Sequence, residues 1–279
     1  MSQTCPCGLP VVIQFSVGLC LHDCGQIGRG SFGFVHAAQD ALGRKKYAIK
    51  YIDIEAGYEK LQHAGSTLQA RSELDMLRQL SHLTIMTLVG FQQHDCHDIL
   101  LFEYAPGDLL QHVMVQGALS SDETSQYMAN ILHGVQYLQQ QNVAHRDLKL
   151  ENMLTLFGTA SRAHVEFSDF SLARHCTSTS GCHTKLFPLD HIAPEVRSSG
   201  PTRDYGYLVD VWACGVAAYS MLTALGPFPD DDNDACVCRG IFVDDDRLHH
   251  GNRFCSFTFV SACMTPAPDL RPLLNLFEF

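Results

Sequence analysis

The first half of the chain carries short stretches in which apolar and polar positions partly alternate, a pattern typical of β-strands. Residues 30–37 and 46–53 show this pattern, and an apolar run at residues 98–104 predicts a third strand. Between the second and third strands, residues 70–80 place apolar side chains at helical spacing, which predicts one helix. The Ala-Pro-Gly sequence at residues 105–107 breaks regular structure and predicts a hinge.

The second half of the chain is mainly helical in its pattern. Ser120, followed three positions later by Glu123, fits a capping box at the start of a helix. An apolar stripe continues that helix through Tyr127, Met128, Ile131, Val135 and Leu138. Residues 208–225 are apolar nearly all round, as in a membrane span or the buried axis of a large domain. Asp210 in the first turn and the modest length of the segment favour the buried axis.

Composition limits the class of protein. A chain of 279 residues, 46% of them hydrophobic and 18% charged, suits one large domain or two small lobes and argues against overall disorder. The formal net charge of -11 argues against a nucleic-acid partner, because phosphate backbones need lysine and arginine. The same charge is compatible with basic protein substrates.

The chain contains 12 cysteines, which is many for its length. Residues 1–10 hold no lysine or arginine that could form the charged start of a secretory signal. The apolar run at residues 9–21 is too short to span a bilayer. We therefore expect an intracellular protein of the cytoplasm or nucleus, with free thiols and no membrane partner. A secreted protein with disulfides is the alternative.

Three glycines, at residues 28, 30 and 33 of the sequence GRGSFGFV, form the first candidate site. Glycines let backbone amides approach a phosphate closely because no Cβ intervenes. The same spacing marks dinucleotide-binding folds, but those require a helix directly after the glycines. The segment after Gly33 has the pattern of a strand, which points away from a dinucleotide site.

Lys50 ends the sequence Tyr-Ala-Ile-Lys in the second predicted strand. A lysine on an alternating strand is normally an exposed side chain without a special role. The interval between Val35 and Lys50 nevertheless fits two short antiparallel strands and a turn. The lysine would then point back under the glycines.

The most specific motif is the sequence HRDLKLEN at residues 145–152. In it, an aspartate, a lysine and an asparagine would form a compact polar loop after an apolar helix. Asp169, in the sequence Asp-Phe-Ser, follows this loop, and Glu195 in Ala-Pro-Glu follows in turn. Asn152 and Asp169 can hold Mg²⁺, a hard cation that prefers oxygen ligands.

These four segments, in this order, resemble the eukaryotic protein kinase family over residues 27–272. The lysine at position 149 resembles the catalytic loop of serine/threonine kinases. The sequences of these motifs are weakly similar to those of the calcium/calmodulin-dependent and AMP-activated kinase group. The resemblance implies an α+β, bilobal fold: an N-terminal extension at residues 1–20, a β-rich N-lobe with one main helix at residues 21–104, and a helical C-lobe at residues 105–279.

The resemblance also implies roles for individual residues. Lys50 would hold the α- and β-phosphates of ATP and pair with Glu73 of the predicted helix. Asp147 would accept or orient the proton of a substrate hydroxyl, and Lys149 would steady the γ-phosphate. Two side chains with oxygen atoms would bind Mg²⁺: Asn152 and Asp169. The residues implied around ATP are Ile27, Gly28, Arg29, Gly30, Ser31, Phe32, Gly33, Phe34, Val35, Ala48, Lys50, Glu103, Ala105 and Leu154.

Structural contacts are implied as well. Glu195 and Arg271 would form an ion pair that ties the activation segment to the C-lobe. Asp210 would begin the central helix that anchors the catalytic loop. Arg146 beside Asp147 is the arrangement in kinases switched by phosphorylation, and candidate hydroxyls lie at residues 177–184.

Three positions depart from the family's pattern. Ser171 replaces a glycine and resists positive φ, so the motion of the magnesium loop would be altered. Phe-Pro at residues 187–188 replaces a Gly-Thr pair whose hydroxyl contacts the catalytic loop. The interval from Asn152 to Asp169 is longer than usual and predicts a longer hairpin.

The leading hypothesis is therefore a serine/threonine protein kinase that transfers the γ-phosphate of ATP to a protein. The alternative from another class is a pseudokinase that acts as a scaffold or allosteric partner, which Ser171 and Pro188 favour. A kinase of small molecules is disfavoured, because Ala-Pro-Glu and Arg271 resemble a platform for a protein substrate. Glu151 and Asp108 stand where some kinases select basic residues, so the protein substrate is expected to be basic.

Overall fold

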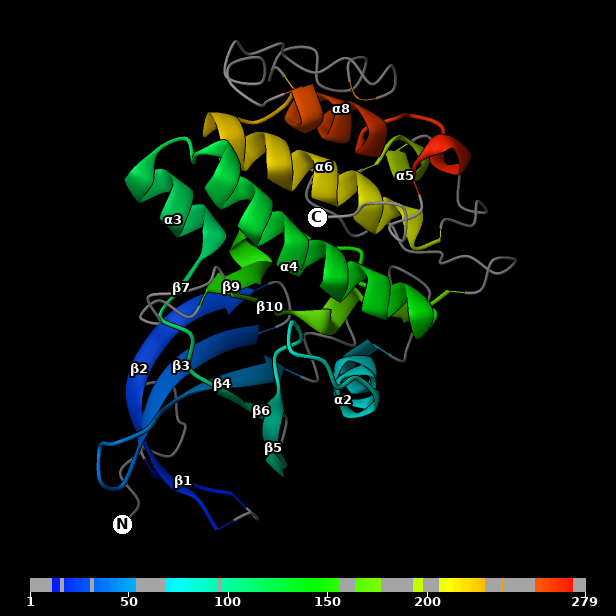
Figure 1. Ribbon diagram of the computed structural model, residues 1–279. Helices are drawn as coiled ribbons and strands as arrows, with labels where there is room; N and C mark the ends of the chain where they lie inside the picture. The colour runs from blue at the N-terminus through cyan, green and yellow to red at the C-terminus, as the bar shows by residue number, and fades with distance from the viewer. Residues whose placement is uncertain are drawn as a thin grey trace. The chain divides into compact units, whose positions relative to one another are not determined.

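The computed structural model describes most of the chain in two compact units (Figure 1). The first unit is Met1–Ser81 with Met86–Ala105, and the second is His82–Ile85 with Pro106–Phe279. The structure describes residues 12–15, 18–30, 33–53, 69–94, 97–155, 164–176, 193–197, 206–228, 237 and 254–272.

Within its described residues, the first unit contains a six-stranded antiparallel sheet and one helix. The strand order is β1-β2-β3-β4-β6-β5. Their bounds are β1 Val12–Gln14, β2 Cys20–Gly30, β3 Gly33–Asp40, β4 Lys46–Asp53, β5 Leu88–His94 and β6 His97–Glu103, and helix α2 is Gln69–Gln79. The strands predicted at residues 46–53 and 98–104 and the helix predicted at 70–80 are confirmed as β4, β6 and α2.

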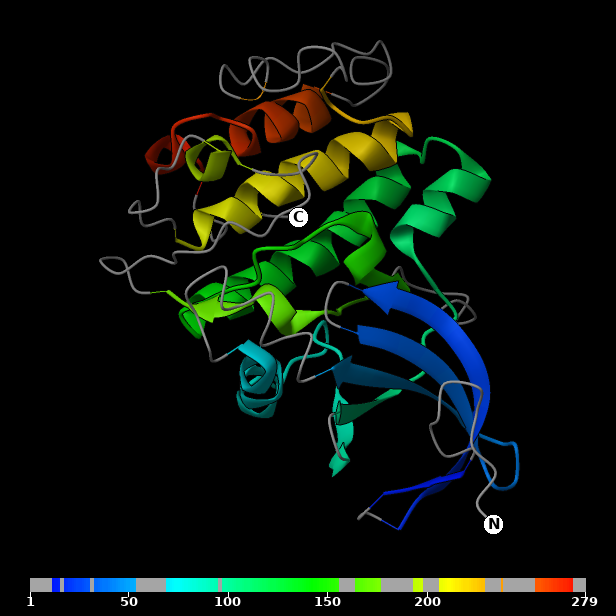
Figure 2. The same cartoon turned by 180° about the vertical axis from the view of Figure 1, so that it is seen from behind.

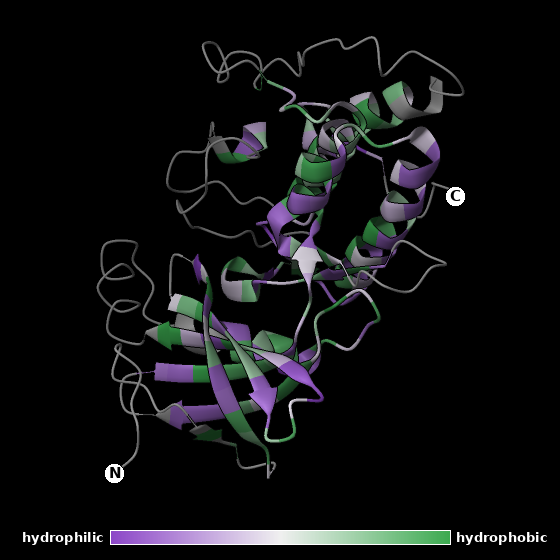
Figure 3. Ribbon diagram, turned by 90° about the vertical axis from the view of Figure 1, so that its left-hand side faces the viewer, coloured by the Kyte–Doolittle hydropathy of each residue, from purple (hydrophilic) through white to green (hydrophobic). Residues whose placement is uncertain are grey.

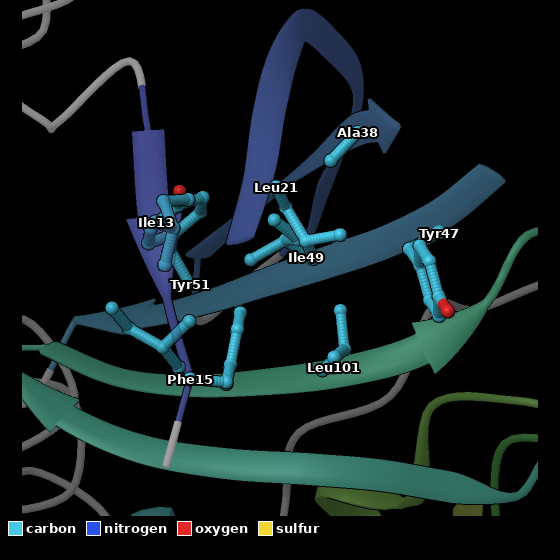
Figure 4. Close-up of a cluster of buried hydrophobic side chains, with 9 residues drawn as sticks. Ile13, Phe15, Leu21, Ala38, Tyr47, Ile49, Tyr51 and Leu101 are labelled. Carbon is cyan, nitrogen blue, oxygen red and sulfur yellow. The ribbon is translucent and has the colours of Figure 1, made fainter. Parts of the chain in front are cut away.

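Hydrophilic and hydrophobic residues are interspersed along the strands of the sheet of the first unit (Figure 3). On β4, Tyr47, Ile49 and Tyr51 join a buried apolar cluster with residues of the neighbouring strands. Ile13 and Phe15 at the start of the described chain pack into the same cluster (Figure 4) and are 3% and 2% exposed. Burying each of these two side chains contributes about 1.5–3 kcal/mol.

The second unit is built mainly of helices. Its described helices are α3 Leu109–Gln116, α4 Ser121–Gln140, α5 Pro194–Arg197, α6 Leu208–Thr223 and α8 Phe254–Cys263. Short strands form two small sheets: β7 Gly107–Asp108, β9 Met153–Thr155 and β10 Val165–Phe167 in one, and β8 Val143–Ala144 with β11 Arg174–His175 in the other. The described part of this unit also contains three 3₁₀ turns: η1 Leu150–Asn152, η2 Phe170–Leu172 and η5 Pro268–Leu270.

Helix α6 is the buried axis of the second unit. It lies between α4 and α8, as the opposite views of Figures 1 and 2 show. A side chain at Gly215 would clash with Cys263 and Met264, so a glycine permits the close approach of α6 to α8. Ser120 caps α4 by accepting a hydrogen bond from the Glu123 amide at 3.2 Å, which confirms the predicted helix start. Within the described ranges, no helix is long and apolar enough to cross a membrane.

Candidate active site

The β2–β3 hairpin carries the predicted glycine sequence. Gly30 pairs with Gly33, and Gly28 pairs with Val35, while Ser31 and Phe32 lie outside the described residues. Strand β3 begins directly at Gly33, which agrees with the prediction against a dinucleotide site. A Cβ at Gly33 would overlap the backbone carbonyl oxygen of Tyr51, so the third glycine is required by packing within the sheet.

Three of the predicted ATP-contacting residues of the first unit, Val35, Ala48 and Lys50, share one face of the sheet. Val35 is paired directly with Lys50, so these two side chains lie on the same face, and Ala48 follows at the alternating position of β4. Ala48 is 7% exposed and is paired with Phe102 of β6.

The remaining predicted ATP-contacting residues of the first unit are placed differently. Ile27 is exposed, and Ala105 ends the unit half-buried. Phe34 pairs with Arg29, but its ring packs against the buried apolar cluster and stacks on Tyr51 with a centroid distance of 4.9 Å, which leaves only its backbone for the predicted contact. The side chain of Glu103 is exposed and bonded to Lys45, which leaves only its backbone available for the predicted contact with adenine.

Lys50 forms an ion pair with Glu73 of α2, as the resemblance implies. The Lys50 Nζ atom lies 2.8 Å from both carboxylate oxygens of Glu73. The two side chains are 14% and 3% exposed, so the pair is largely removed from water. A charge-assisted pair with little access to water fixes the position of the lysine far better than an exposed pair does.

In the second unit, Asp210 of α6 holds the backbone at the start of the catalytic loop. Its carboxylate accepts the amide N–H groups of His145 at 2.7 Å and Arg146 at 2.8 Å. Arg146 has a φ of 72°, an uncommon conformation for a non-glycine residue that these bonds help to maintain. Burial raises the pKa of the Asp210 carboxyl to about 6, although the two amides act in the opposite direction.

Asp147, Lys149 and Asn152 come together in the loop between β8 and β9. The Lys149 Nζ atom lies 3.2 Å from an Asp147 carboxylate oxygen. Asn152 Nδ2 donates to the same carboxylate oxygen at 2.9 Å and to the Asp147 carbonyl at 2.8 Å. Burial raises the pKa of the Asp147 carboxyl, Lys149 opposes this rise, and the charge of Asp169 adds to it.

Asp169 follows β10 in a left-handed conformation, with φ 58° and ψ 67°. The preceding residue, Ser168, donates its amide to the Asn152 carbonyl at 2.9 Å, and its own carbonyl accepts from His145 Nε2 at 2.9 Å. The His145 and Phe170 rings lie 4.6 Å apart by their centroids. These contacts tie the Asp169 segment to the catalytic loop within one unit.

The residues present fit a bound magnesium ion. Asn152 uses its amide nitrogen toward Asp147, so its amide oxygen remains for a cation, and Asp169 supplies a carboxylate. Mg²⁺ binds through one or two protein oxygen ligands and shares the phosphate oxygens of a nucleotide. The assignment of Asn152 and Asp169 as metal ligands remains a prediction.

Other predicted residues of the second unit have definite places. Leu154 lies in β9, half-buried. Asp108 caps α3 by accepting the Gln111 amide at 2.8 Å, and Glu151 is exposed in η1. The longer interval before Asp169 is framed by the antiparallel strands β9 and β10.

Arg271 and Glu195 form the predicted ion pair. Two Arg271 nitrogens lie 2.6 and 2.7 Å from the two Glu195 oxygens, and Arg271 also donates to the Leu208 carbonyl at 2.9 Å. The Arg271 guanidinium lies 5.1 Å from the Trp212 ring. Residues 177–188, which contain the candidate phosphorylation sites and Phe-Pro, lie outside the described residues.

Sequence reasoning did not find Ser168, whose backbone links His145 to Asn152. Its shorter contacts are made by its amide and carbonyl groups, and its hydroxyl donates to the same Asn152 carbonyl at 3.3 Å. A serine outside the motifs gives no sequence signal for such contacts. Ser171 was expected to resist positive φ. It lies in η2 and is not among the described non-glycine residues with positive φ, so its present conformation is unstrained.

A family model described as protein kinase domain matches residues 21–270. CBL-interacting serine/threonine-protein kinase 17 of Arabidopsis thaliana is 29% identical over 88% of this chain and 55% of its own length. Serine/threonine-protein kinase SRK2F of the same plant is 31% identical over 74% and 56%, and serine/threonine-protein kinase H1 of Homo sapiens is 34% identical over 74% and 47%. The chain thus spans about half the length of the curated relatives it matches.

Proposed function

The chain belongs to the protein kinase family, and on this premise we propose that it transfers the γ-phosphate of ATP to a serine or threonine hydroxyl of another protein. The observation that carries the proposal is the arrangement around Asp147. Its carboxylate is bonded to Lys149 and Asn152 and is influenced by the charge of Asp169. The proposed base Asp147 therefore lies close to the ammonium of Lys149 and to the two proposed oxygen ligands of Mg²⁺, Asn152 and Asp169.

Asp147 would orient the substrate hydroxyl and accept its proton as the new P–O bond forms. The bond between the γ-phosphorus and the bridging oxygen then breaks, and ADP leaves with that oxygen. Burial favours proton uptake by raising the pKa of the Asp147 carboxyl, because a base is more effective when its pKa lies closer to the working pH. Lys149 would offset negative charge on the transferred phosphoryl group.

Asn152 and Asp169 would hold Mg²⁺, which neutralises negative charge on the phosphate oxygens when it is bound. Asn152 also donates to Asp147, so one residue links the metal ligands with the base. Asp210 acts through the backbone, since it fixes the two amides directly before Asp147. Lys50, held by Glu73, would bind the α- and β-phosphates.

The proposed substrate is a protein with basic residues near the target hydroxyl. Glu151 is exposed in η1, and the net charge of -11 favours basic partners. Asp108 contributes less to this proposal, because one of its carboxylate oxygens already caps α3. The names of the relatives quoted above are those of serine/threonine kinases, which supports the choice of hydroxyl.

The pseudokinase hypothesis rests on Ser171 and Pro188. Ser171 adopts an unstrained conformation next to a complete set of charged residues, so it gives no support to a scaffold role. Pro188 lies outside the described residues. Neither the described site nor the comparisons support the pseudokinase hypothesis.

The proposal is tested by incubating the protein with Mg²⁺, γ-labelled ATP and a peptide library that varies the residues around serine, threonine or tyrosine. We expect label on serine or threonine peptides, with basic neighbours preferred. Asp147→Asn is the matched control, because it keeps the side-chain volume and removes the base. Transfer by the wild type that equals transfer by Asp147→Asn would overturn the proposal.

A further inference from the structure

Ser171 occupies a position next to the predicted metal ligand at which the resemblance implies glycine. It is the middle residue of η2, between Phe170 and Leu172, and is 9% exposed. The turn is closed by a hydrogen bond from the Ala173 amide to the Phe170 carbonyl at 3.1 Å. Residue 171 therefore lies inside a closed, buried turn two positions after Asp169.

The backbone of Ser171 is compatible with any L-residue. Positive φ occurs among the described non-glycine residues at Asn142, Arg146, Asp169 and Ala224, and Ser171 is not one of them. A glycine at this position would have access to positive φ, whereas serine and alanine both favour the negative φ that Ser171 adopts. The relevant property of the residue is thus the presence of a Cβ atom.

The hydroxyl of Ser171 does not explain the choice of serine. It makes no hydrogen bond to any part of the chain that the structure describes. Replacement of the hydroxyl by hydrogen should therefore leave the turn unchanged. Ser171→Ala removes only the hydroxyl, whereas Ser171→Gly also removes the Cβ. Comparing the two variants separates the effect of the Cβ from that of the hydroxyl.

Asp169 needs support from its neighbours because a left-handed conformation is unfavourable for a non-glycine residue. On its N-terminal side, Ser168 is bonded to Asn152 and to His145. On its C-terminal side, the Phe170 ring is fully buried and packs against the His145 ring. The closed turn at residues 170–172 restricts where Phe170 can lie, and so restricts the backbone that carries the Asp169 carboxylate.

We propose that Ser171 is a positioning residue whose Cβ confines the turn after Asp169 and so keeps the Asp169 carboxylate beside the catalytic loop. Its effect on the reaction rests on the proposed function, in which Asp169 binds Mg²⁺ with ATP. The effect on the turn itself does not, because it concerns the protein without ligand.

The expected size of the effect of Ser171→Gly follows from the backbone freedom that a Cβ atom removes. Replacing glycine by a residue with a Cβ at a compatible φ shifts a conformational equilibrium by about two- to fivefold. Ser171→Gly should therefore raise the population of open turns by about that factor. Ser171→Ala should leave it unchanged.

Hydrogen exchange on the ligand-free protein tests the proposal. The Ala173 amide closes the turn, and the Ser168 amide binds Asn152, so these two amides report opening on both sides of Asp169. In Ser171→Gly we expect their exchange, corrected for intrinsic rates, to be about two- to fivefold faster. The amides of His145 and Arg146, which Asp210 accepts, serve as an internal reference that should not change.

Two exchange results would overturn the proposal. One is equal exchange in Ser171→Gly and the wild type. The other is an increase in Ser171→Ala as large as in Ser171→Gly, because the hydroxyl would then be responsible.

Nucleotide binding gives a second readout. Ser171→Gly should weaken binding of ADP with Mg²⁺ by no more than the factor seen in exchange, and should leave binding of ADP with a chelator unchanged. An equal loss in both conditions would contradict a role through Asp169. A protein with the expected exchange but no phosphate transfer would instead count against the proposed function alone.

Discussion

Lys50 in the first unit and the catalytic loop in the second are held by different kinds of contact. Lys50 forms an ion pair with a buried side chain, Glu73, which lies 23 positions away. The loop depends on a carboxylate, Asp210, that accepts two backbone amides from 64 and 65 positions away. A side-chain ion pair can be removed as a pair, whereas backbone amides stay behind when their acceptor is lost. The two regions should therefore respond differently to substitution.

The largest expected effect comes from breaking the ion pair on one side only. Lys50→Met removes the Lys50 ammonium from the buried Glu73 carboxylate, which should destabilise the protein by about 3–5 kcal/mol. The double variant Lys50→Met with Glu73→Leu should recover most of this stability, because both charges are gone. Both variants should remain deficient in phosphate transfer.

Unfolding in urea, followed by far-UV circular dichroism, measures these differences. Trp212 is the sole tryptophan and lies in α6, so its fluorescence follows the second unit. Equal midpoints for Lys50→Met and the wild type would contradict the account of Lys50. So would a double variant less stable than the single one.

A smaller effect is expected in the hairpin beside Lys50. Gly33→Ala places a Cβ against the Tyr51 carbonyl oxygen, and because this atom is backbone the strands must separate. The expected loss is about 1–3 kcal/mol. Gly28→Ala is the matched control, since its Cβ would meet Val35 at an ordinary 3.8 Å. Urea midpoints that fall equally in both variants would show that the close approach at Gly33 is unimportant.

The smallest effect concerns the pH dependence of the Asp210 contact. Its folded pKa of about 6 lies above the ordinary 3.8, so the folded protein binds the proton more tightly than the unfolded chain. The contribution of this shift to stability is fully present below 3.8 and is lost as the pH rises through about 6. Relative to Asp210→Asn, the wild type should therefore gain stability as the pH is lowered from 7 toward 5.

The gain should not exceed about 1.4 kcal/mol per pH unit. Trp212 fluorescence in urea at several pH values measures it in the second unit. A difference between wild type and Asp210→Asn that is independent of pH would exclude a raised pKa for Asp210.

How much the sequence could predict differs between strands. The strand β4 was predicted at its observed bounds, since its side chains alternate between a buried apolar cluster and the face that carries Lys50. Strand β2 was not predicted, because irregularities at Asp23/Gly25 and Gln26/Gly28 interrupt its alternation. Strand β1 is 3 residues long, too short to show a period.

The candidate site was predictable where side chains carry the chemistry. Asp147, Lys149 and Asn152 lie within one short motif, so their proximity follows from the chain itself. The role of Ser168 was not predictable, because it acts mainly through its backbone groups and its hydroxyl contact to the Asn152 carbonyl belongs to no motif. The conformation of Ser171 also required coordinates, since a residue name does not give the sign of φ.

The most direct test of the central claim compares Asp147→Asn with Asp169→Asn in a single turnover, with affinity for Mg²⁺ and nucleotide measured alongside. If Asp147 is the base, its variant should bind nearly as the wild type does and transfer phosphate about 100- to 10,000-fold more slowly. Asp169→Asn should lose the part of the affinity that depends on Mg²⁺. Transfer at the wild-type rate by Asp147→Asn, with binding intact, would contradict the account.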